Sequence, residues 1–313
     1  MNDLYDKRLC LPSRKDFESL EEKPEFFTTA SRKRIAYYQY GDPKGHPLLF
    51  YHGTGSHIQA MCLHKPALEY GFRIIAPDRP GVGLSEFSPG WSVLEFARDI
   101  GKLTDHLGLD SFGIVGISGA GPTLMASAYV LEKRLKCVID LACAMPLYKD
   151  KEALSELGGT DRFYARLGTR LPLIVFQFPF SLIGITMKFL KKPELFAKMF
   201  KSSLCPADQE IFSIPDFQYF LMKDFQTLFR NGSKAAAHDA QNVYRNWGFS
   251  LSEIKTHIEG FQGTADKFIP PVFSSHMAKT VLDSNLNLIE GQGHFCHIVY
   301  CYNTLRKIKE LFY

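Results

Sequence analysis

Residues 116–120, Gly-Ile-Ser-Gly-Ala, place a serine in a turn whose composition suits an exposed nucleophile. The apolar run 112–116 reads as a strand and the apolar run after the turn reads as a helix, so the backbone must turn sharply at Ser118. Such a turn needs small residues two positions before and two positions after the serine, and Gly116 and Ala120 meet that need. It presents the hydroxyl at the end of a sheet, beside a helix N-terminus. Ser118 is therefore a candidate nucleophile.

A serine hydroxyl is a weak nucleophile until a base takes its proton and an acid orients that base. When the serine lies on a strand-to-helix turn, the partners are expected in later loops, in the order Ser, Asp, His. Asp266 follows the strand-like run 257–262, and His294 follows the strand-like run 286–290. The sequence therefore predicts a catalytic triad of Ser118, Asp266 and His294.

An acyl-transfer site also needs two N–H donors for the negative charge that develops on the carbonyl oxygen. Gly119 follows the nucleophile and supplies one N–H. The glycine-rich loop 52–56, which follows the expected strand 48–51, supplies the N–H of Thr54 as the other. We predict that Gly119 and Thr54 form the oxyanion hole.

Strand-like and helix-like stretches alternate through the first half of the chain, which is typical of helices packed on a mostly parallel sheet. Ser92 and Glu95 form a capping box, and Gly108 stands where that helix would end. The fold class predicted is α/β, with a mostly parallel central sheet flanked by helices. The expected strands cover residues 35–40, 48–51, 72–76, 112–116, 137–142, 257–262 and 286–290, and the expected helices cover residues 92–107 and 124–131.

The alternation stops over residues 146–252, which are helical in pattern and rich in phenylalanine. Because the strand pattern resumes afterwards, we predict a core formed by residues 1–145 and 253–313 and a helical cap, or lid, formed by residues 146–252. The phenylalanines and the charge-free stretch 171–187 are expected to line an apolar substrate pocket. The phenylalanines are Phe163, Phe176, Phe178, Phe180, Phe217, Phe220, Phe225 and Phe229.

The order of the triad and the two glycine-rich turns resemble the α/β-hydrolase superfamily, and in particular serine-nucleophile members with a helical cap among uncharacterised bacterial α/β hydrolases. The resemblance runs from about residue 29 to residue 308, is weakest in the insertion, and implies the α/β-hydrolase fold. It includes residues 77–85, which are similar to the loop before the first large helix in that family. Residues 230–232, Asp239 and residues 246–249 also resemble a segment common in those bacterial members.

This sequence departs from the family pattern at two places. Ala120 stands where the strict pattern has glycine, and the loop 52–55 lacks the proline that is usual there. In the family, aspartate at the nucleophile position would imply epoxide hydrolase or haloalkane dehalogenase chemistry. The serine at this position argues against both.

Three other acidic or basic residues invite a functional interpretation. Asp140, at the end of an earlier expected strand, is an alternative acid for the triad, but it lies inside an apolar run. Asp78 and Arg79 follow another expected strand, and we expect them to brace their loop rather than to touch substrate.

Neither a metal nor an organic cofactor is expected. Cys296 and His297 follow His294 closely, but a helix flank beside the site is favoured over a metal centre. The glycines of residues 116–121 do not have the G-x-G-x-x-G spacing of a dinucleotide-binding loop, and no ribose-binding acid is evident.

Composition excludes several classes of protein. The 313 residues are 45% hydrophobic and 22% charged, which is ordinary for a globular protein and argues against a disordered or fibrous chain. The net charge is +4 and no long basic block occurs, so no nucleic-acid partner is expected.

The seven cysteines are an odd number without C-x-x-C spacing, which favours a reducing compartment. Charged residues occupy the N-terminus where a signal peptide would have its apolar region, so we expect a cytoplasmic protein. The charge-free stretch 171–187 is shorter than the roughly 20 residues of a spanning helix and contains two prolines, so stable membrane insertion is not expected.

Together these patterns predict a serine hydrolase that cleaves a small or medium apolar carboxylic ester through an acyl-enzyme. The same triad also serves carbon–carbon bond hydrolysis, acyl transfer and cofactor-free perhydrolysis, and the sequence does not separate these reactions. A hydrolase-like ligand sensor with slow turnover is the alternative from another class.

Overall fold

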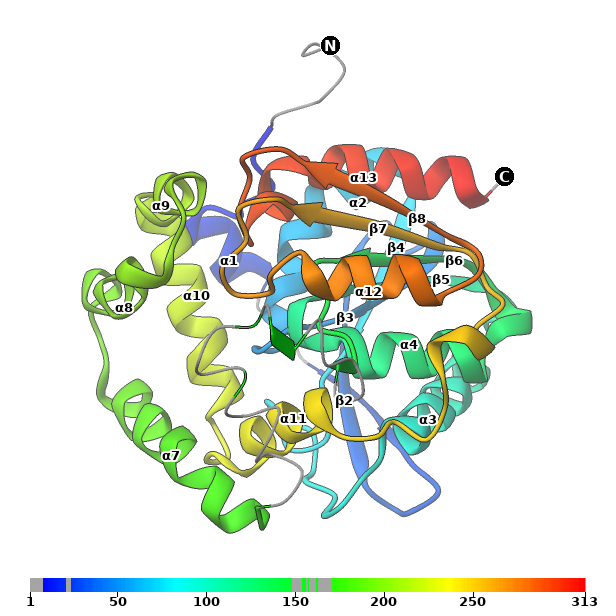
Figure 1. The fold of residues 1–313 in the computed structure, drawn as a ribbon, viewed down its shortest axis with the longest axis horizontal. Helices are drawn as coiled ribbons and strands as arrows, with labels where there is room; N and C mark the ends of the chain where they lie inside the picture. The colour runs from blue at the N-terminus through cyan, green and yellow to red at the C-terminus, as the bar shows by residue number, and fades with distance from the viewer. Residues whose placement is uncertain are drawn as a thin grey trace.

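The computed structural model describes residues 8–20, 24–147, 154–155, 157, 162 and 171–312. An eight-stranded sheet in the order β1-β2-β4-β3-β5-β6-β7-β8 forms its centre (Figure 1). Strand β2 runs antiparallel to β1 and β4, and the other neighbouring strands are parallel, so the predicted α/β class is confirmed. The strands are β1 (Glu25–Thr28), β2 (Arg34–Gly41), β3 (His46–Tyr51), β4 (Phe72–Pro77), β5 (Phe112–Ile117), β6 (Leu135–Leu141), β7 (Ile258–Gly263) and β8 (Ser284–Ile289).

Helices cover both faces of the sheet. Ile74 and Ile75 of β4 are fully buried in different apolar clusters, because successive strand residues point to opposite faces. Both faces are covered, which explains why the central strands are continuous apolar runs. One face packs on α2 (His64–Tyr70) and α13 (Cys296–Phe312), and the other packs on α3 (Val93–His106), α4 (Gly121–Val130) and α12 (Val272–Thr280).

The expected elements form within a few residues of their predicted ends. The capping box of α3 is present: the Ser92 hydroxyl accepts from the Glu95 N–H at 3.2 Å, and the Glu95 carboxylate accepts from the Ser92 N–H at 2.8 Å. Gly108 follows α3 with φ of +67°, in the left-handed region that favours glycine. Strand β1 was not predicted, because its four residues are mostly exposed and show no alternation of burial.

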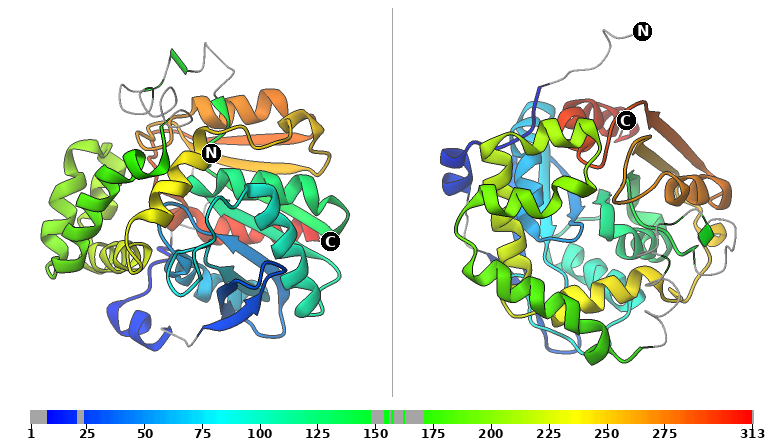
Figure 2. Two further views of the ribbon diagram at one scale, coloured as in Figure 1. Left: turned by 90° about the horizontal axis from the view of Figure 1, so that it is seen from below. Right: turned by 60° about the vertical axis from the view of Figure 1, so that its left-hand side comes forward.

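A group of helices interrupts the sheet between β6 and β7, which pair directly and in parallel. These helices lie beyond the carboxyl ends of the strands (Figure 1), and α7 lies at their outer edge (Figure 2). The boundaries predicted for the cap, residues 146 and 252, remain a prediction. The helices are α7 (Leu173–Phe189), α8 (Pro193–Phe200), α9 (Pro206–Phe212), α10 (Pro215–Leu228) and α11 (Lys234–Tyr244). A short helix near the start of the chain, α1 (Arg14–Leu20), packs against α10.

Two cysteines that the sequence analysis left unpaired form a disulfide. Cys10 and Cys301 lie 291 residues apart in the chain with their Cα atoms 6.3 Å apart. Such a long separation carries no spacing pattern, so only the fold reveals the pair. The other five cysteines are free and buried.

Within the described ranges, no helix has the length and apolar composition needed to cross a membrane.

Candidate active site

Ser118 lies on the sharp turn between β5 and α4 that the sequence predicts. Its φ is +55°, which is uncommon for a residue other than glycine and costs about 1–3 kcal/mol. The small neighbours are required by contact: a Cβ at Gly116 would lie 3.0 Å from the Leu124 side chain. A Cβ at Gly121 would collide with the carbonyl oxygen of Ala144. The backbone therefore holds the serine in a strained, half-buried position at the end of the strand.

The structure brings Ser118, His294 and Asp266 into one hydrogen-bonded chain. The Nε2 of His294 lies 3.0 Å from the Ser118 hydroxyl, and its Nδ1 lies 2.7 Å from Oδ2 of Asp266. Because a carboxylate only accepts, Nδ1 carries the proton and Nε2 is free to accept one. The other oxygen of Asp266 accepts from the N–H groups of Phe268 and Ile269 at 2.8 and 2.9 Å, which fixes the carboxylate.

The alternative acid, Asp140, is not in this chain. Its carboxylate accepts from the N–H of Cys143 at 2.8 Å, and burial raises its pKa to about 7. The carboxylate that bonds the His294 ring is that of Asp266.

Two opposing effects act on the pKa of His294. Burial lowers the pKa of the imidazole, because a charged ring is poorly solvated there. The carboxylates of Asp266 and Asp208 favour the charged ring and raise the pKa above its ordinary value. The net direction is upward, so the site stabilises an imidazolium.

The loop that follows β3 lies against the serine turn. A Cβ built at Gly119 would lie 3.2 Å from the backbone nitrogen of Thr54, so the two N–H groups proposed for the oxyanion come from adjacent backbone. Gly53 has no room for a side chain, because a Cβ there would lie 2.9 Å from that of Ser118. The close approach explains the glycine at this position.

The sequence analysis expects Asp78 and Arg79 to brace their own loop, whereas in the structure their side chains bond to the loop that follows β3 and to the residues beside it. Arg79 donates to the carbonyl oxygens of His52 and Gly53, the latter at 2.7 Å, and pairs with Asp239 of α11 at 2.9 Å. Asp78 is fully buried and accepts from the backbone N–H of His57 at 2.7 Å.

Sequence reasoning missed two fully buried carboxylates from the helices above the sheet. Asp208 of α9 accepts from the N–H groups of His294 and Phe295, each at 3.0 Å. Asp224 of α10 accepts from both the N–H and the hydroxyl of Ser56 at 2.7 Å. Each carboxylate therefore holds the backbone of a loop that carries a predicted site residue.

One sequence signal points to Asp224. It lies on the buried face of α10, in helical register with Phe217, Phe220 and Leu228. An acid on the apolar face of a helix indicates a buried polar partner, because a lone buried charge is costly.

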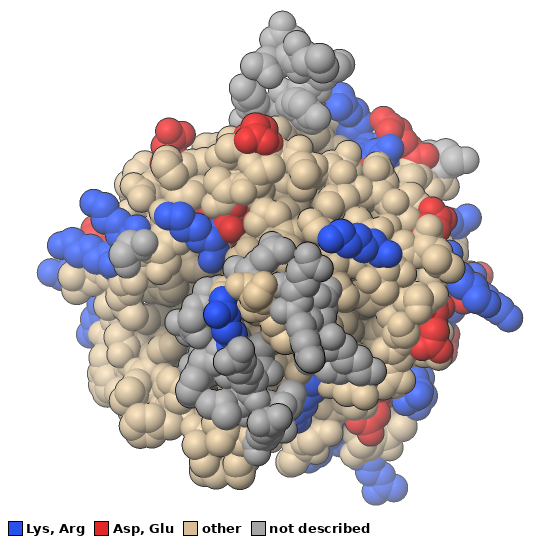
Figure 3. All heavy atoms as spheres, viewed as in Figure 1, with Lys and Arg blue, Asp and Glu red and all other residues tan. Residues whose placement is uncertain are grey.

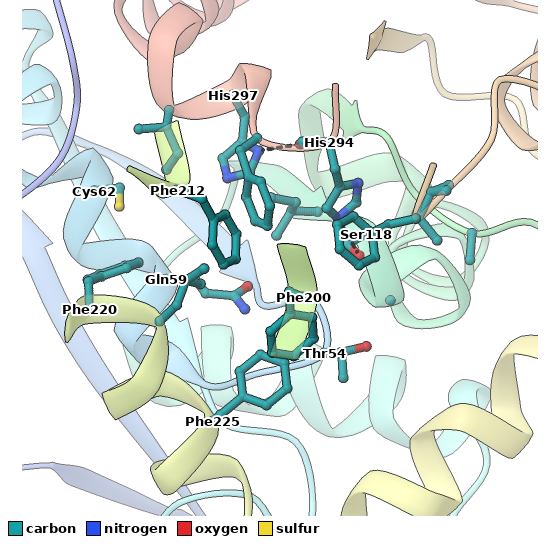
Figure 4. A pocket seen from close by; sticks show the side chains of 18 of the residues that line it. Thr54, Gln59, Cys62, Ser118, Phe200, Phe212, Phe220, Phe225, His294 and His297 are labelled. Atoms are coloured by element: carbon teal, nitrogen blue, oxygen red, sulfur yellow. Dashed lines mark hydrogen bonds between the residues drawn. The ribbon is translucent and has the colours of Figure 1, made fainter. Parts of the chain in front are cut away.

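A cavity of about 360 Å³ opens beside the serine hydroxyl (Figure 4). Its polar groups are few, and Ser118, Thr54, Gln59, His294 and His297 supply most of them. This volume and lining are typical of a pocket for a small or medium apolar ligand. The aromatic lining residues are Phe196, Phe200, Phe212, Phe217, Phe220, Phe225, Tyr244, Phe268, Phe273 and Phe295.

The charge-free stretch 171–187 does not line this cavity, so that expectation was wrong. Its helix, α7, packs on the far side of α10 and α11, which supply lining residues of the cavity. Phe176 is buried and packs against Phe180, while Phe178 is exposed. Phe229 also packs in the core, and Phe163 lies outside the described residues. The phenylalanines that line the cavity come from α8, α9 and α10 and from the core.

His297 lines the cavity but belongs to no metal cluster. Burial lowers its pKa to about 3, and the nearby His294 acts in the same direction, so the ring is neutral. Its Nδ1 donates to the carbonyl oxygen of His294 at 3.1 Å. Among the residues that the structure describes, no three His, Cys, Asp or Glu side chains are placed to hold a metal ion.

Comparison with known proteins identifies the family. A sequence model of the alpha/beta hydrolase fold matches residues 46–299. The chain therefore belongs to the alpha/beta hydrolase family.

Individual relatives match a shorter part of the sequence. Haloalkane dehalogenase 2 of Mycobacterium bovis is 40% identical over 114 residues, which is 35% of this chain and 38% of that protein. An uncharacterised hydrolase of Bacillus subtilis, YcgS, is 36% identical over 80 residues, 26% of this chain and 28% of that protein. The chain thus matches well under half the length of these curated relatives.

Solved structures share the fold over nearly the whole chain. An esterase from Exiguobacterium antarcticum superposes with a TM-score of 0.67 at 17% identity, covering 92% of this chain and 98% of the esterase.

Proposed function

We propose that this chain is a serine hydrolase that cleaves a small or medium apolar carboxylic ester through an acyl-enzyme. The observation that carries the proposal is the hydrogen-bonded chain from Ser118 through His294 to Asp266, which opens onto an aromatic cavity. Acyl transfer requires a nucleophile, a base and an orienting acid in this arrangement.

In the proposed reaction, Nε2 of His294 takes the Ser118 proton as the hydroxyl oxygen attacks the ester carbonyl. Asp266 keeps the Nδ1–H tautomer and stabilises the imidazolium. The N–H groups of Gly119 and Thr54 donate to the oxyanion. His294 then gives its proton to the leaving alkoxide, and water cleaves the acyl-enzyme by the same proton path.

The nucleophile separates this chemistry from that named for the dehalogenase relative. A serine oxygen that displaced a halide from an alkyl carbon would form an ether, which has no carbonyl for water to attack. A carboxylic ester instead gives an acyl-serine, which water can hydrolyse and so free the serine. Ser118 therefore favours an ester over an alkyl halide as substrate.

The aromatic lining of the cavity favours a substrate whose acyl group is apolar. Phe200 and Phe225 approach each other at 5.7 Å between ring centroids, and Phe196 lies 5.4 Å from Phe225. A sugar or a phosphate ester would need more polar partners than this wall offers.

Two measurements test the proposal. A fluorophosphonate probe should label the wild-type chain and not Ser118→Ala, and Ser252→Ala, which removes an exposed serine, is the matched control. A series of p-nitrophenyl esters should then show kcat/KM rising from acetate to medium acyl chains. Absence of labelling in the wild type contradicts the serine-hydrolase proposal.

The same measurements separate the alternatives. Labelling without ester turnover would favour the slow ligand sensor. Equal rates for acetate and for longer acyl chains would contradict the apolar acyl pocket while leaving the nucleophile in place.

A further inference from the structure

Helix α7 presents a row of large apolar side chains to solvent. Ile174, Phe178 and Phe189 are 73%, 68% and 72% exposed. Side chains three or four residues apart share one face of a helix, so the row forms a single stripe along its whole length. The stripe consists of Ile174, Val175, Phe178, Leu182, Ile185 and Phe189, and Leu195 and Met199 of α8 are exposed as well.

The opposite side of α7 is packed and hydrogen-bonded within the protein. Phe176 and Met187 are buried, and Gln177 and Ser181 each bond the hydroxyl of Ser233 at 2.8 Å. The helix is therefore docked firmly with its other apolar face outward. A surface helix of a globular protein normally turns charged residues to solvent, and a contiguous exposed apolar patch marks an interaction site.

Lysines surround the C-terminal end of this stripe. Five exposed lysines occur within 14 residues, and Glu194 is the only acid between residues 171 and 207. Figure 3 shows an uncharged surface in the region of α7 with basic side chains gathered beside it, towards α8. Within the described ranges, none of the five forms an ion pair. The lysines are Lys188, Lys191, Lys192, Lys198 and Lys201.

We propose that the outer face of α7, together with these lysines, docks on the surface of an anionic phospholipid bilayer. The 17 residues of α7 extend about 25 Å, and because its inner face is packed it can lie along the bilayer but not enter it end-on. Phe178, Leu182 and Phe189 then enter the boundary between headgroups and acyl chains, and the lysines reach the phosphates.

Charge favours this occupant over a second copy of the chain. A twofold interface places the same patch of both copies together, so two lysine clusters would meet with a single acid each to offset them. An anionic bilayer instead attracts each lysine, and binding then weakens as salt is added.

The test is sedimentation of the full chain with vesicles. Wild-type protein should sediment with vesicles of equal parts phosphatidylcholine and phosphatidylserine and much less with phosphatidylcholine alone. The double variant Phe178→Gln/Phe189→Gln should lose at least about tenfold in partition, because each exchange removes apolar area from the boundary. Lys191→Gln/Lys192→Gln should lose about 25-fold in partition, at roughly fivefold per lysine.

Matched variants control for general loss of apolar or basic surface. Leu282→Gln/Leu288→Gln removes exposed apolar side chains elsewhere, and Lys44→Gln/Lys136→Gln removes exposed lysines elsewhere. Both should sediment like the wild type. All variants should keep wild-type fluorophosphonate labelling, which separates failed docking from a failed fold or a failed nucleophile.

Three results would overturn the proposal. The first is no sedimentation of the wild type, or equal sedimentation with neutral vesicles. The second is undiminished sedimentation of the α7 double variant. The third is a stable dimer in solution that becomes monomeric in that variant, which would assign the face to a second copy.

Discussion

The carboxylate of Asp208 accepts a hydrogen bond from the backbone N–H of His294 at 3.0 Å, although 86 residues separate them in the chain. Its second oxygen accepts from the N–H of Phe295. Helix α9 thus holds the loop that carries the proposed base, and the negative charge of Asp208 also acts on the imidazole. Asp208 is a positioning residue for His294.

Replacing Asp208 with asparagine should change both stability and the pH profile. Asparagine keeps one accepting oxygen but turns an NH₂ group towards a backbone N–H, so one buried donor is left unpaired. The free energy of unfolding should fall by about 1–3 kcal/mol. Loss of the charge should also lower the pKa of His294. The rising limb of the profile of kcat/KM against pH should therefore shift to lower pH than in the wild type.

Asp105→Asn is the matched control, since Asp105 makes an exposed ion pair with Arg134 at 2.7 Å. It should leave the pH profile unchanged. A purely structural role for Asp208 would lower stability without moving the profile, and that result would contradict its action on His294.

The proposed mechanism requires a neutral His294, so its pH dependence has a definite sign. The ring is protonated below its pKa, and kcat/KM should therefore fall as the pH drops through a value above 6.5. Asp266→Asn removes the neighbouring charge and the preferred tautomer. It should reduce kcat by about 10⁴ and move the rising limb to lower pH.

A second Asp–His pair, which lies at the surface, provides the comparison. Asp283 lies 2.7 Å from His257 at the surface, and Asp283→Asn should leave the pH profile of ester hydrolysis unchanged. An unaltered kcat in Asp266→Asn would contradict the assigned triad.

Gln59 connects the proposed oxyanion loop to α10. Its Oε1 accepts from the Gly53 N–H at 2.7 Å, and its Nε2 donates to Asp224 at 2.8 Å. Gln59→Met keeps the size of the side chain but frees the Gly53 N–H. We expect the unfolding free energy to fall by about 1–3 kcal/mol and the rate of fluorophosphonate labelling to fall as well.

Gln226→Met is matched to this exchange, because Gln226 also bonds backbone within the same group of helices, at Met187 and Leu190. It should lower the melting temperature without slowing labelling. Equal labelling rates for both variants would show that Gln59 does not position the loop.

Enlarging a side chain in the cavity wall should change the preference of the enzyme for acyl chain length. Phe225 lines the cavity, and Phe225→Trp adds volume there. The kcat/KM for medium-chain esters should fall by at least about tenfold relative to acetate, because a filled pocket cannot hold the longer chain. Phe178→Trp, on the exposed face of α7, should keep the wild-type order of substrates. If Phe225→Trp keeps that order too, the acyl chain does not occupy this cavity.

Local sequence was sufficient to predict the scaffold and the three residues of the proposed triad. The turn at Ser118 needs small neighbours, and the loops at Asp266 and His294 follow parallel strands whose carboxyl ends share one edge of the sheet. Each of these constraints acts over a few residues or follows from the order of the strands. The spacing and composition of the sequence therefore reveal it.

Contacts between distant segments depended on the tertiary structure. Asp208 and Asp224 lie in helices that also carry other polar residues, and only packing shows which backbone N–H groups their carboxylates meet. The same holds for the stretch 171–187, which was expected to line the pocket: a helix that is apolar all round does not encode which face is buried. Packing against α10 and α11 selected one face of α7 and left the other, beside its lysines, at the surface.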